Sequence, residues 1–439
     1  MAKEVKKVKK GYIIYGIGLS TNKDSYKAGI EAATKALKKL DKRKPKISYV
    51  FFSGDYDPYA LSKGLKEILN SSEFVGGSAD SVFFNDTMTK KGVLVVSLYS
   101  EYLNVGVASF ENASKNPKEI AKKTIVEAMS KVPIDKYVDP YLLFTRLKNT
   151  DISWMVKIPS FFVVLLTRGI KLPVMGDETQ IIKGISEVIG LQVPIFGGSF
   201  GADAMKVLMN QPYEINMLHS GKVMKDGLII LFNSTSLLYS NSMANGCVPT
   251  NKEGFISEVK NDGFIVTKIS NKDAVDWYAE KLGLSKSTFL KNVRLLTQLH
   301  PLGIPDHLGN YLIRGGGIYT GKGLAYVAPL VKGWPVYIMD GGANKLMNAT
   351  DELKEDIDNY IQTKEKPALI FTTLCVTREL VYQKNTIKEV KKLRKRFGNA
   401  NVVGFTCFGE TGSKAGQQAK FEHVTLNIFN IYDKLMTQL

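Results

Sequence analysis

Apolar runs recur along this chain in three copies of one order. Each copy has an apolar run, an amphipathic segment, a second apolar run beside glycine or other turn residues, and a further apolar run. The apolar runs lie at residues 48–52, 74–78 and 92–98, then at 162–166, 195–199 and 227–232, and finally at 368–371, 403–407 and 424–429. Short apolar runs bounded by turn residues predict buried strands. The irregular spacing excludes a short-period solenoid, so the pattern predicts three quasi-repeated β-α-β-β units.

The segments between these runs have helical periodicity. Behind Asp24, a predicted N-cap, apolar residues recur at steps of three and four, at Tyr26, Ile30, Ala33, Leu37 and Leu40. Further helices are predicted at 58–69, 117–132, 178–189, 273–282, 343–361 and 386–397. Residues 255–269 predict a hairpin around Asn261-Asp262-Gly263. The run at 93–98 leads directly into 103–108, which predicts antiparallel neighbours and therefore an α/β fold of mixed sheets covered by helices.

Length and composition predict a globular protein with more than one core, since the chain has 439 residues, of which 44% are hydrophobic. Residues 133–160 contain three prolines and predict an extended connection, and the turn residues at 249–254 predict a boundary. We therefore divide the chain into 1–250 and 251–439. No apolar run reaches the roughly 18 residues that cross a bilayer, and no cleavable leader is visible. The three distant cysteines indicate neither a disulfide framework nor a zinc site, so we expect a cytoplasmic protein that does not contact a membrane.

The net charge of +17 is typical of proteins that bind polyanions such as nucleic acid. Basic residues are dispersed, with local density at 3–10, 38–46 and 388–396. The last two segments lie on or beside predicted amphipathic helices, where a charged face opposite an apolar one is typical. We therefore do not expect nucleic acid to be the main partner, and a basic scaffold or nucleic-acid-associated protein remains an alternative.

Seven short segments follow one another as in a known family. They are residues 245–249, 274–283, 300–303, 311–314, 371–378, 404–410 and 423–426. In this order the chain resembles FIST-domain proteins, named for F-box and intracellular signal transduction, with an N-terminal FIST region followed by a C-terminal one. The resemblance implies a sensory domain that binds small ligands, amino acids among the candidates, and passes the signal to an output domain.

The chain departs from the family pattern in three places. Gly76-Gly77-Ser78 and Asp80 stand where many relatives have a cysteine and a Gly-Glu pair, and Asn245-Gly246 replaces His-Gly. The two regions also use up the chain and leave no kinase, cyclase or F-box segment. A sensor of this kind would signal through a separate partner protein, and homodimerisation is compatible with that role.

Charged residues near the ends of the third copy's runs are candidate ligand-binding residues. Arg378 and Glu410 follow two predicted strands, where loops commonly build sites. An arginine there would bind a carboxylate bidentately and a glutamate would accept an ammonium group, as an amino-acid ligand requires. Alternatively, the two pair with each other or with surface charges. Arg314 is a third candidate unless it is a solvated strand end, and His423, near Glu410 in sequence, is a fourth.

A glycine-bearing loop supplies further candidates. Gly197, Gly198 and Ser199 follow a strand and would present N–H groups to an anion. Their spacing matches neither a Walker loop nor a dinucleotide fingerprint. A tight turn with positive φ is the favoured explanation for these glycines. The matching Gly76-Gly77-Ser78 fits an anion-binding loop and a tight turn equally well.

The sequence evidence for a catalytic or metal-binding site is weaker than that for a ligand site. Cys407 with His423 and Glu410 would make a thiol nucleophile, although an apolar neighbourhood favours an inert buried thiol. His300, Asp306 and His307 lack the ligand spacing of a helix face. We therefore expect no metal, no cofactor and no catalytic residue, and predict a small-ligand sensory protein. A hydrolase that uses Cys407 or a threonine is the alternative.

Overall fold

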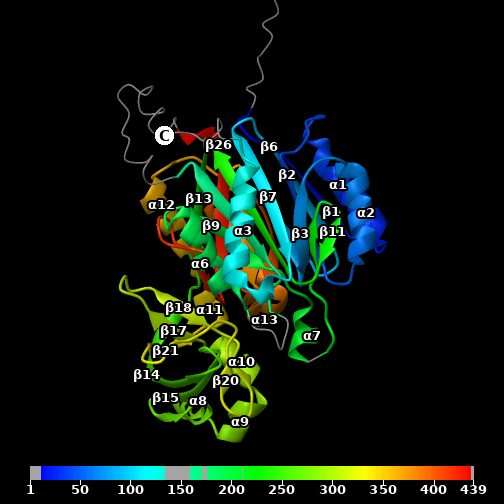
Figure 1. The fold of residues 1–439 in the computed structure, drawn as a ribbon. Helices are drawn as coiled ribbons and strands as arrows, with labels where there is room; N and C mark the ends of the chain where they lie inside the picture. Colours follow the sequence, from blue (N-terminus) through cyan, green and yellow to red (C-terminus); the bar gives the residue numbers. More distant parts are fainter. Residues whose placement is uncertain (1–10, 134–158, 171–175, 210, 437–439) are drawn as a thin grey trace, which may run out of the picture.

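The computed structural model describes residues 11–133, 159–170, 176–209 and 211–436. Most of the predicted connection at 133–160 and the basic segment at 3–10 lie outside these residues. A larger body with three six-stranded sheets stands above a smaller lobe with its own sheet (Figure 1). Within the described ranges, no helix is both long and apolar enough to cross a bilayer.

The larger body consists of three units with one strand order. The first comprises β1 (Ile14–Ser20), α1 (Ser25–Lys38), β2 (Ile47–Ser53), α2 (Pro58–Leu69), β3 (Phe74–Ala79) and β6 (Val93–Tyr99). The second comprises β7 (Leu103–Glu111), α3 (Pro117–Ser130), β8 (Phe161–Thr167), α6 (Glu178–Ile189), β9 (Ile195–Ser199) and β12 (Gly227–Thr235). The third comprises β13 (Leu237–Ala244), α12 (Ala349–Ile361), β22 (Leu369–Cys375), α13 (Val376–Tyr382), α14 (Thr386–Arg396), β23 (Asn401–Cys407) and β26 (Leu426–Leu435). In each unit, the last strand (β6, β12 or β26) lies between the first and second strands and is antiparallel to both. The second and third strands are parallel neighbours.

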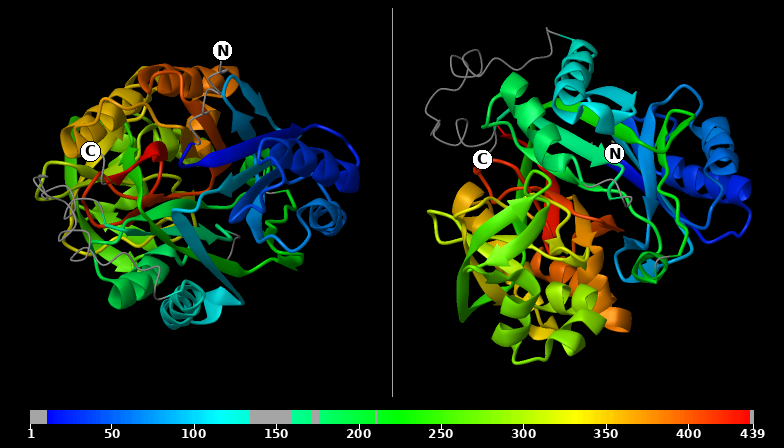
Figure 2. Two further views of the ribbon diagram at one scale, coloured as in Figure 1. Left: turned by 90° about the horizontal axis from the view of Figure 1, so that it is seen from above. Right: turned by 60° about the horizontal axis from the view of Figure 1, so that its bottom comes forward.

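Each unit also donates a hairpin to the sheet of another unit. The hairpin of β4 (Val82–Phe84) and β5 (Thr87–Thr89), from the first unit, extends β23 of the third. The hairpin of β10 (Met217–His219) and β11 (Lys222–Met224), from the second, extends β3 of the first. The hairpin of β24 (Glu410–Gly412) and β25 (Lys420–Glu422), from the third, extends β9 of the second. The exchange closes a ring, which Figure 2 shows from above.

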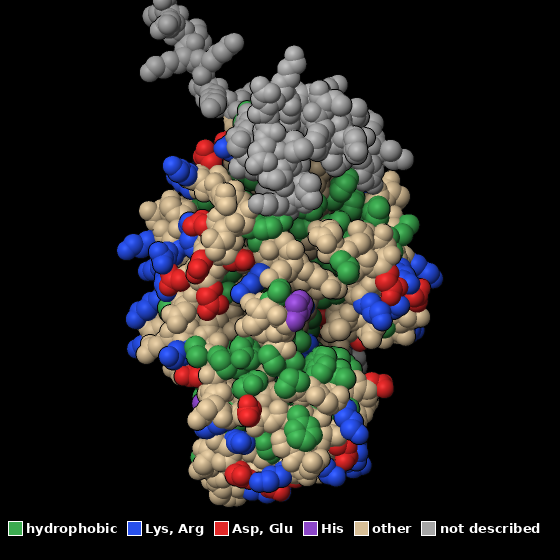
Figure 3. Space-filling view, turned by 90° about the vertical axis from the view of Figure 1, so that its left-hand side faces the viewer, with side chains coloured by type: hydrophobic (Ala, Val, Ile, Leu, Met, Phe, Trp, Pro, Cys, Tyr) green, Lys and Arg blue, Asp and Glu red, His purple; other side chains and the backbone are tan. Residues whose placement is uncertain are grey.

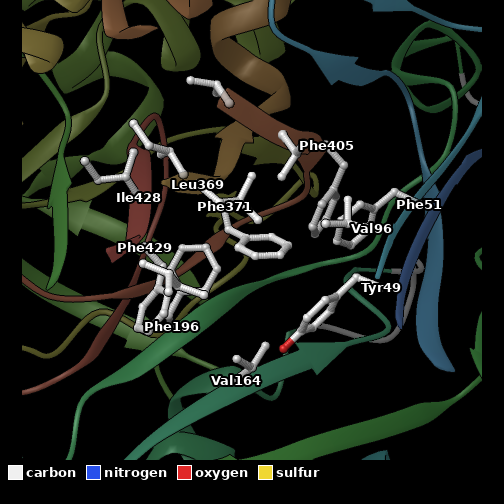
Figure 4. Close-up of a cluster of buried hydrophobic side chains, with 14 of the residues drawn as sticks. Tyr49, Phe51, Val96, Val164, Phe196, Leu369, Phe371, Phe405, Ile428 and Phe429 are labelled. Atoms are coloured by element: carbon white, nitrogen blue, oxygen red, sulfur yellow. The ribbon is translucent and has the colours of Figure 1, made fainter. Parts of the chain in front are cut away.

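One apolar core fills the space between the three sheets. Aromatic rings from all three units meet there. Phe51 lies against Phe405 at 4.4 Å between ring centroids (Figure 4). Phe162 lies against Phe429 at 4.5 Å. The helices cover the outer faces of the sheets (Figure 1). Burial of the inner faces is the main source of stability for such an arrangement.

The three predicted copies are confirmed as the strand sets β2-β3-β6, β8-β9-β12 and β22-β23-β26. Most predicted helices are also found, including α1 with Asp24 as its N-cap. The predicted helix at 343–361 is two helices, α11 (Ala343–Leu346) and α12. The predicted antiparallel pairing of 93–98 with 103–108 is wrong, because β6 stays in the first sheet while β7 crosses to pair with β12 in the second. A pattern of apolar runs cannot distinguish a hairpin from such a crossing.

The smaller lobe is inserted after β13, where the other units have their first helix. Its strands are β14 (Val248–Lys260), β15 (Ile265–Ile269), β16 (Lys272–Asp273), β17 (Leu302–Pro305), β18 (Tyr311–Arg314), β19 (Ile318–Tyr319), β20 (Leu324–Ala325) and β21 (Pro335–Asp340), and its helices are α8 (Ala274–Leu282), α9 (Lys286–Lys291) and α10 (Val293–Leu299). The predicted hairpin is β14–β15, and its three turn residues Asn261, Asp262 and Gly263 have positive φ. The boundary at residue 250 falls inside β14, and it stays a prediction.

Lysine and arginine side chains alternate with acidic ones on the face of the body in Figure 3, and hydrophobic side chains gather where the lobe meets the body. Many lysines are paired, such as Lys118 and Lys122 with Glu187 at 2.6 Å each. The positive charge is thus dispersed on this face, as the sequence indicated.

Candidate functional site

A cavity of about 120 Å³ lies where the lobe joins the body. On one side are residues of the second and third units, and on the other are Arg294 and Gln298 of α10, Gly315 and Gly316 after β18, Ile318 and Val327. One bound water needs about 10–15 Å³ on this scale, so the cavity has room for a small metabolite.

The cavity opens at the carboxyl ends of two strands. After β8 ends, Ile170 lines it, and at the end of β22 it is lined by Cys375, Val376 and Thr377. The carboxyl ends of parallel strands are the usual location of ligand sites in α/β sheets, because loops there leave the sheet in different directions. Phe408, directly after β23, closes the inner wall.

His423 is, with Thr377, a buried polar residue among those that line this cavity. It lies between β25 and β26 and is 6% exposed, and its ring packs edge-on against Phe421 at 5.0 Å. Both ring nitrogens are shielded from solvent, and the main chain of Ile313 is their nearest hydrogen-bonding group, although the geometry is poor. Burial, assisted by the charge of Arg314, lowers the pKa of His423 to about 3. The imidazole is therefore neutral, with one donor and one acceptor nitrogen.

Gln298, on α10 of the lobe, is a further polar residue of the lining. Its Oε1 is shielded from solvent and has no hydrogen-bond partner among the described residues. Polar residues of the body and of the lobe thus both contribute to the cavity wall.

The backbone beside His423 is strained. Val424 has φ of 61°, a conformation that is unfavourable for a β-branched residue. Its carbonyl accepts a hydrogen bond from Arg378 at 2.8 Å, and its side chain is buried. Arg378 thus helps to hold the segment that orients His423 toward the cavity.

Arg378 itself is occupied by the protein. Its five N–H groups bind Glu389 bidentately and the carbonyls of Asn245, Val424 and Leu346, and its side chain is fully buried. The sequence predicts a carboxylate ligand here, or else pairing with Glu410 or with surface charges. The structure shows a third arrangement, an ion pair with Glu389 of α14, and we leave Arg378 out of the proposed contact residues.

Glu410 is also buried and bound within the protein. Cys407 Sγ donates to its Oε1 at 2.8 Å, and the Thr425 N–H and hydroxyl donate to Oε2. Burial raises the pKa of Glu410 to about 7. Glu410 is not among the described residues that line the cavity.

Cys407 does not have the environment of an activated nucleophile. It is fully buried, and burial raises the pKa of its thiol well above the ordinary value. Its hydrogen-bond partner is Glu410, and His423 instead faces the cavity. Cys375 does line the cavity, but burial raises the pKa of its thiol to about 12. Both cysteines are thus protonated at neutral pH and poor nucleophiles.

Gly197, Gly198 and Ser199 form part of β9 and not a turn. The explanation by positive φ is therefore wrong. A Cβ at Gly197 would lie 1.8 Å from the Leu165 carbonyl oxygen, and the equivalent glycines of the other units, Gly76 and Gly404, lie equally close to their neighbours. The repeated glycine is required by close strand packing. Ser199 Oγ is bonded to Thr167 and Glu178, away from the cavity.

Arg314 connects the lobe to the body. It is buried, and its Nη1 donates to the Phe421 carbonyl at 2.9 Å. It is not a solvated strand end, and it lies behind His423, outside the set that lines this cavity. Of the predicted candidates, only His423 therefore lines the cavity directly.

The described residues contain no group of three or more His, Cys, Asp or Glu side chains that could hold a metal ion. His300 is partly buried, which lowers its pKa, whereas His307 is exposed.

Comparison with protein families decides the classification. The FIST N domain matches residues 47–272, and the FIST C domain matches residues 274–413. The chain belongs to the FIST family. FIST domains are generally sensory domains that bind small ligands in signal transduction. The two matches meet at residues 272–274, inside the lobe.

Other comparisons add little. No curated protein matches significantly. Among solved structures, cyanuric acid hydrolase from A. caulinodans is 8% identical, with 51% of this chain and 71% of that chain covered and a TM-score of 0.27. Phosphoribosylformylglycinamidine synthase II from Thermotoga maritima is 12% identical, with 82% and 74% covered and a TM-score of 0.23. These scores are too low for any argument about this FIST protein.

Sequence reasoning missed the cavity residues outside the motifs. Gln298 lies on a short helix, α10, for which no helix was predicted. Phe408, Gly315 and Gly316 also line the cavity, and none of them was a predicted site residue.

Proposed function

We propose that this FIST protein is a cytoplasmic sensor that binds a small metabolite in the cavity between body and lobe. The observation that carries the proposal is the cavity of about 120 Å³ at the carboxyl ends of β8 and β22, lined by both body and lobe. Strand ends of this kind are the usual location of small-ligand sites in α/β sheets.

The position of the cavity suggests how binding produces a signal. Its walls come from the second unit, the third unit and the lobe, so an occupant contacts all three. Direct links between lobe and body include Arg294 to the Val207 carbonyl at 3.1 Å and Lys414 to Asn310 at 2.6 Å. A ligand that binds one arrangement of lobe and body more tightly shifts the population toward it. A separate partner protein, or a second copy of the chain, would recognise that arrangement.

Thermal unfolding in the presence of metabolite pools tests the proposal. Free amino acids form the first pool, because the family resemblance names them as candidates. Ligand at one hundred times its Kd adds about 2.7 kcal/mol to the free energy of unfolding. We expect one pool to raise Tm at both low and high salt, and the rise to be lost in His423→Phe.

The matched control is His307→Ala, which removes an exposed histidine of the lobe. This variant should respond like the wild type. A rise in Tm that persists in His423→Phe would locate the ligand elsewhere. Stabilisation by polyanions alone, and only at low salt, would favour the basic-scaffold alternative.

A further inference from the structure

The cavity between body and lobe has a positive charge on its lobe side. Among the described residues that line it, Arg294 of α10 is the one that is charged at neutral pH, and no Asp or Glu is present. Arg294 is partly buried, and its Nη1 donates to the Val207 carbonyl of the body at 3.1 Å. A charge in a partly buried, mostly apolar site is screened less than one on an open surface. The wall therefore attracts an anion and disfavours a cation.

Gln298 adds a neutral donor on the same face of α10. Residues four apart on a helix are neighbours on its surface, and both Arg294 and Gln298 line the cavity. The Oε1 of Gln298 is shielded, so an occupant does not reach it. The Nε2 lies toward Gly316, another lining residue, since a Cβ built on Gly316 would be 4.0 Å from it. A guanidinium and an amide nitrogen are both donors, and together they suit the oxygen atoms of one anion.

The number of charges restricts the kind of anion. One guanidinium compensates one negative charge, and a carboxylate matches its planar fork with two oxygen atoms. A phosphate monoester carries about 1.5–2 negative charges at pH 7, so part of its charge would stay uncompensated in a mostly apolar site.

A positive group on the ligand is also disfavoured. The ammonium of an amino acid would lose its water shell near Arg294 without gaining a carboxylate from the cavity wall. The carboxylates of Asp80 and Glu379, on neighbouring segments, are paired with Lys90 and do not line the cavity. The remaining wall is mostly apolar, with Phe408 on the body side, and favours a ligand whose other atoms are carbon.

We infer that the ligand is a small monocarboxylate with an uncharged apolar body, and neither a free amino acid nor a phosphate ester. The inference rests on the proposed function, because it assigns the ligand class of the same cavity. The carboxylate lies at Arg294 and Gln298 Nε2, and the apolar body lies against Phe408 and Ile318. Small aryl- and alkyl-substituted carboxylic acids belong to this class.

Four probes that share one ring test the charge of the head group. Phenylacetate is a monoanion, phenylacetamide is uncharged, phenyl phosphate carries more than one negative charge, and phenylalanine carries an ammonium beside its carboxylate. Affinities are measured by calorimetry on the full chain, and the methyl resonances of Ile318 in NMR spectra report whether a probe enters the cavity. We expect phenylacetate to bind at least about tenfold more tightly than the other three probes and to shift the Ile318 resonances.

Variants of α10 test the two contacts. Arg294→Gln should weaken phenylacetate binding at least about tenfold and leave phenylacetamide binding unchanged. Arg294→Lys, which keeps the charge without the planar fork, should recover part of the loss. Gln298→Glu places a carboxylate one turn from Arg294 and should weaken phenylacetate binding about tenfold.

The matched control is Lys291→Gln, which removes a positive charge from an exposed position of α9 outside the cavity lining. It should leave all four affinities unchanged. Circular dichroism verifies the fold of each variant, and the ranking of the four probes on the wild type tests the ligand class even if a variant does not fold.

The outcomes distinguish the two proposals. Tighter binding of any other probe than of phenylacetate, with a shift of the Ile318 resonances, overturns the monocarboxylate class and leaves the sensor site in place. Unchanged phenylacetate affinity in Arg294→Gln, or an equal loss in Lys291→Gln, overturns the assigned contact. If no probe at millimolar concentration shifts the Ile318 resonances, the monocarboxylate class is also overturned. If, in addition, no metabolite pool raises Tm, the proposed function fails as well.

Discussion

Two buried polar regions of this FIST protein lie on either side of Val424 and differ in how they are satisfied. On one side, Arg378 uses all five N–H groups within the protein. On the other, His423 and Gln298 leave polar atoms unpaired beside a cavity. A fully paired polar residue holds the fold together, whereas an unpaired buried atom contributes no such bond and leaves the cavity wall less tightly fixed. Burial and charge alone would not have separated these roles.

Arg378→Met should give the largest effect. The substitution leaves Glu389 buried without its cation, and removing one member of a buried ion pair costs about 3–5 kcal/mol of the free energy of unfolding. The measurement is the midpoint of urea unfolding.

The control for this variant is Arg43→Met, at a partly exposed pair with Asp41 at 3.5 Å. Its effect should be within about 0.5–1 kcal/mol. A loss below 1 kcal/mol in Arg378→Met would contradict the view that this region is a structural clamp.

Glu410→Gln tests the paired region through pH. Because the pKa of Glu410 is raised to about 7 in the folded protein against 4.5 in the unfolded chain, protonation favours the folded state. The wild type should therefore lose stability relative to the variant as pH rises from about 4.5 to 7, by a total on the order of 3 kcal/mol, and no further above that range.

Chemical unfolding at a series of pH values measures this difference. Glu127→Gln, at a largely exposed glutamate paired with Lys131, should show no comparable slope. A wild type that instead gains stability over this range relative to Glu410→Gln would show that the fold stabilises the charged carboxylate.

Gly404→Ala and Gly315→Ala compare packing between two strands of the body with packing at the cavity. Its Cβ would lie 1.9 Å from the Thr372 carbonyl oxygen, so overpacking should cost about 1–3 kcal/mol. At Gly315, which lines the cavity, the nearest atom to an added Cβ is Val424 Cγ2 at 3.2 Å, so a shift of a few tenths of an ångström makes room for it. Gly315→Ala should therefore cost less than 1 kcal/mol in the same unfolding assay, and equal costs would refute the contrast.

His423→Phe should give the smallest effect at neutral pH, less than about 1 kcal/mol in either direction, because the imidazole has no partner to lose. Since the pKa of His423 is lowered to about 3 against 6.5 in the unfolded chain, protonation favours unfolding. The wild type should lose stability relative to the variant as pH falls from about 6.5 toward 3. A loss above 3 kcal/mol at pH 7 would mean that the histidine is structural.

Much of the secondary structure could be predicted from the sequence because it depends on local signals. The bounds of α2 and α6 follow from apolar periodicity, and the β14–β15 turn follows from Asn261-Asp262-Gly263. Sheet partners depend on distant segments, so the hairpin exchange was not foreseen. The glycine of β9 was misread for the same reason, since its constraint comes from Leu165 on another strand.

The site was predictable only in part. His423 was selected because it lies near Glu410 in sequence, yet its partner across the cavity is Gln298, on a separate lobe. Arg378 and Glu410 stood at strand ends as expected, but the pattern could not reveal that Glu389 and Thr425 already satisfy them. Which buried groups pair with each other depends on how distant segments pack, and the sequence pattern does not contain that information.

The closed hairpin exchange has a consequence for the order of synthesis. When the first unit leaves the ribosome, the open edge of β3 must wait for β10, more than one hundred residues later, and β4 must wait for β23 near the end of the chain. An uncovered strand edge is a template for pairing with other chains. The nascent protein is therefore vulnerable to aggregation until its last unit is made, and a chaperone that shields strand edges would be needed most during the middle of translation.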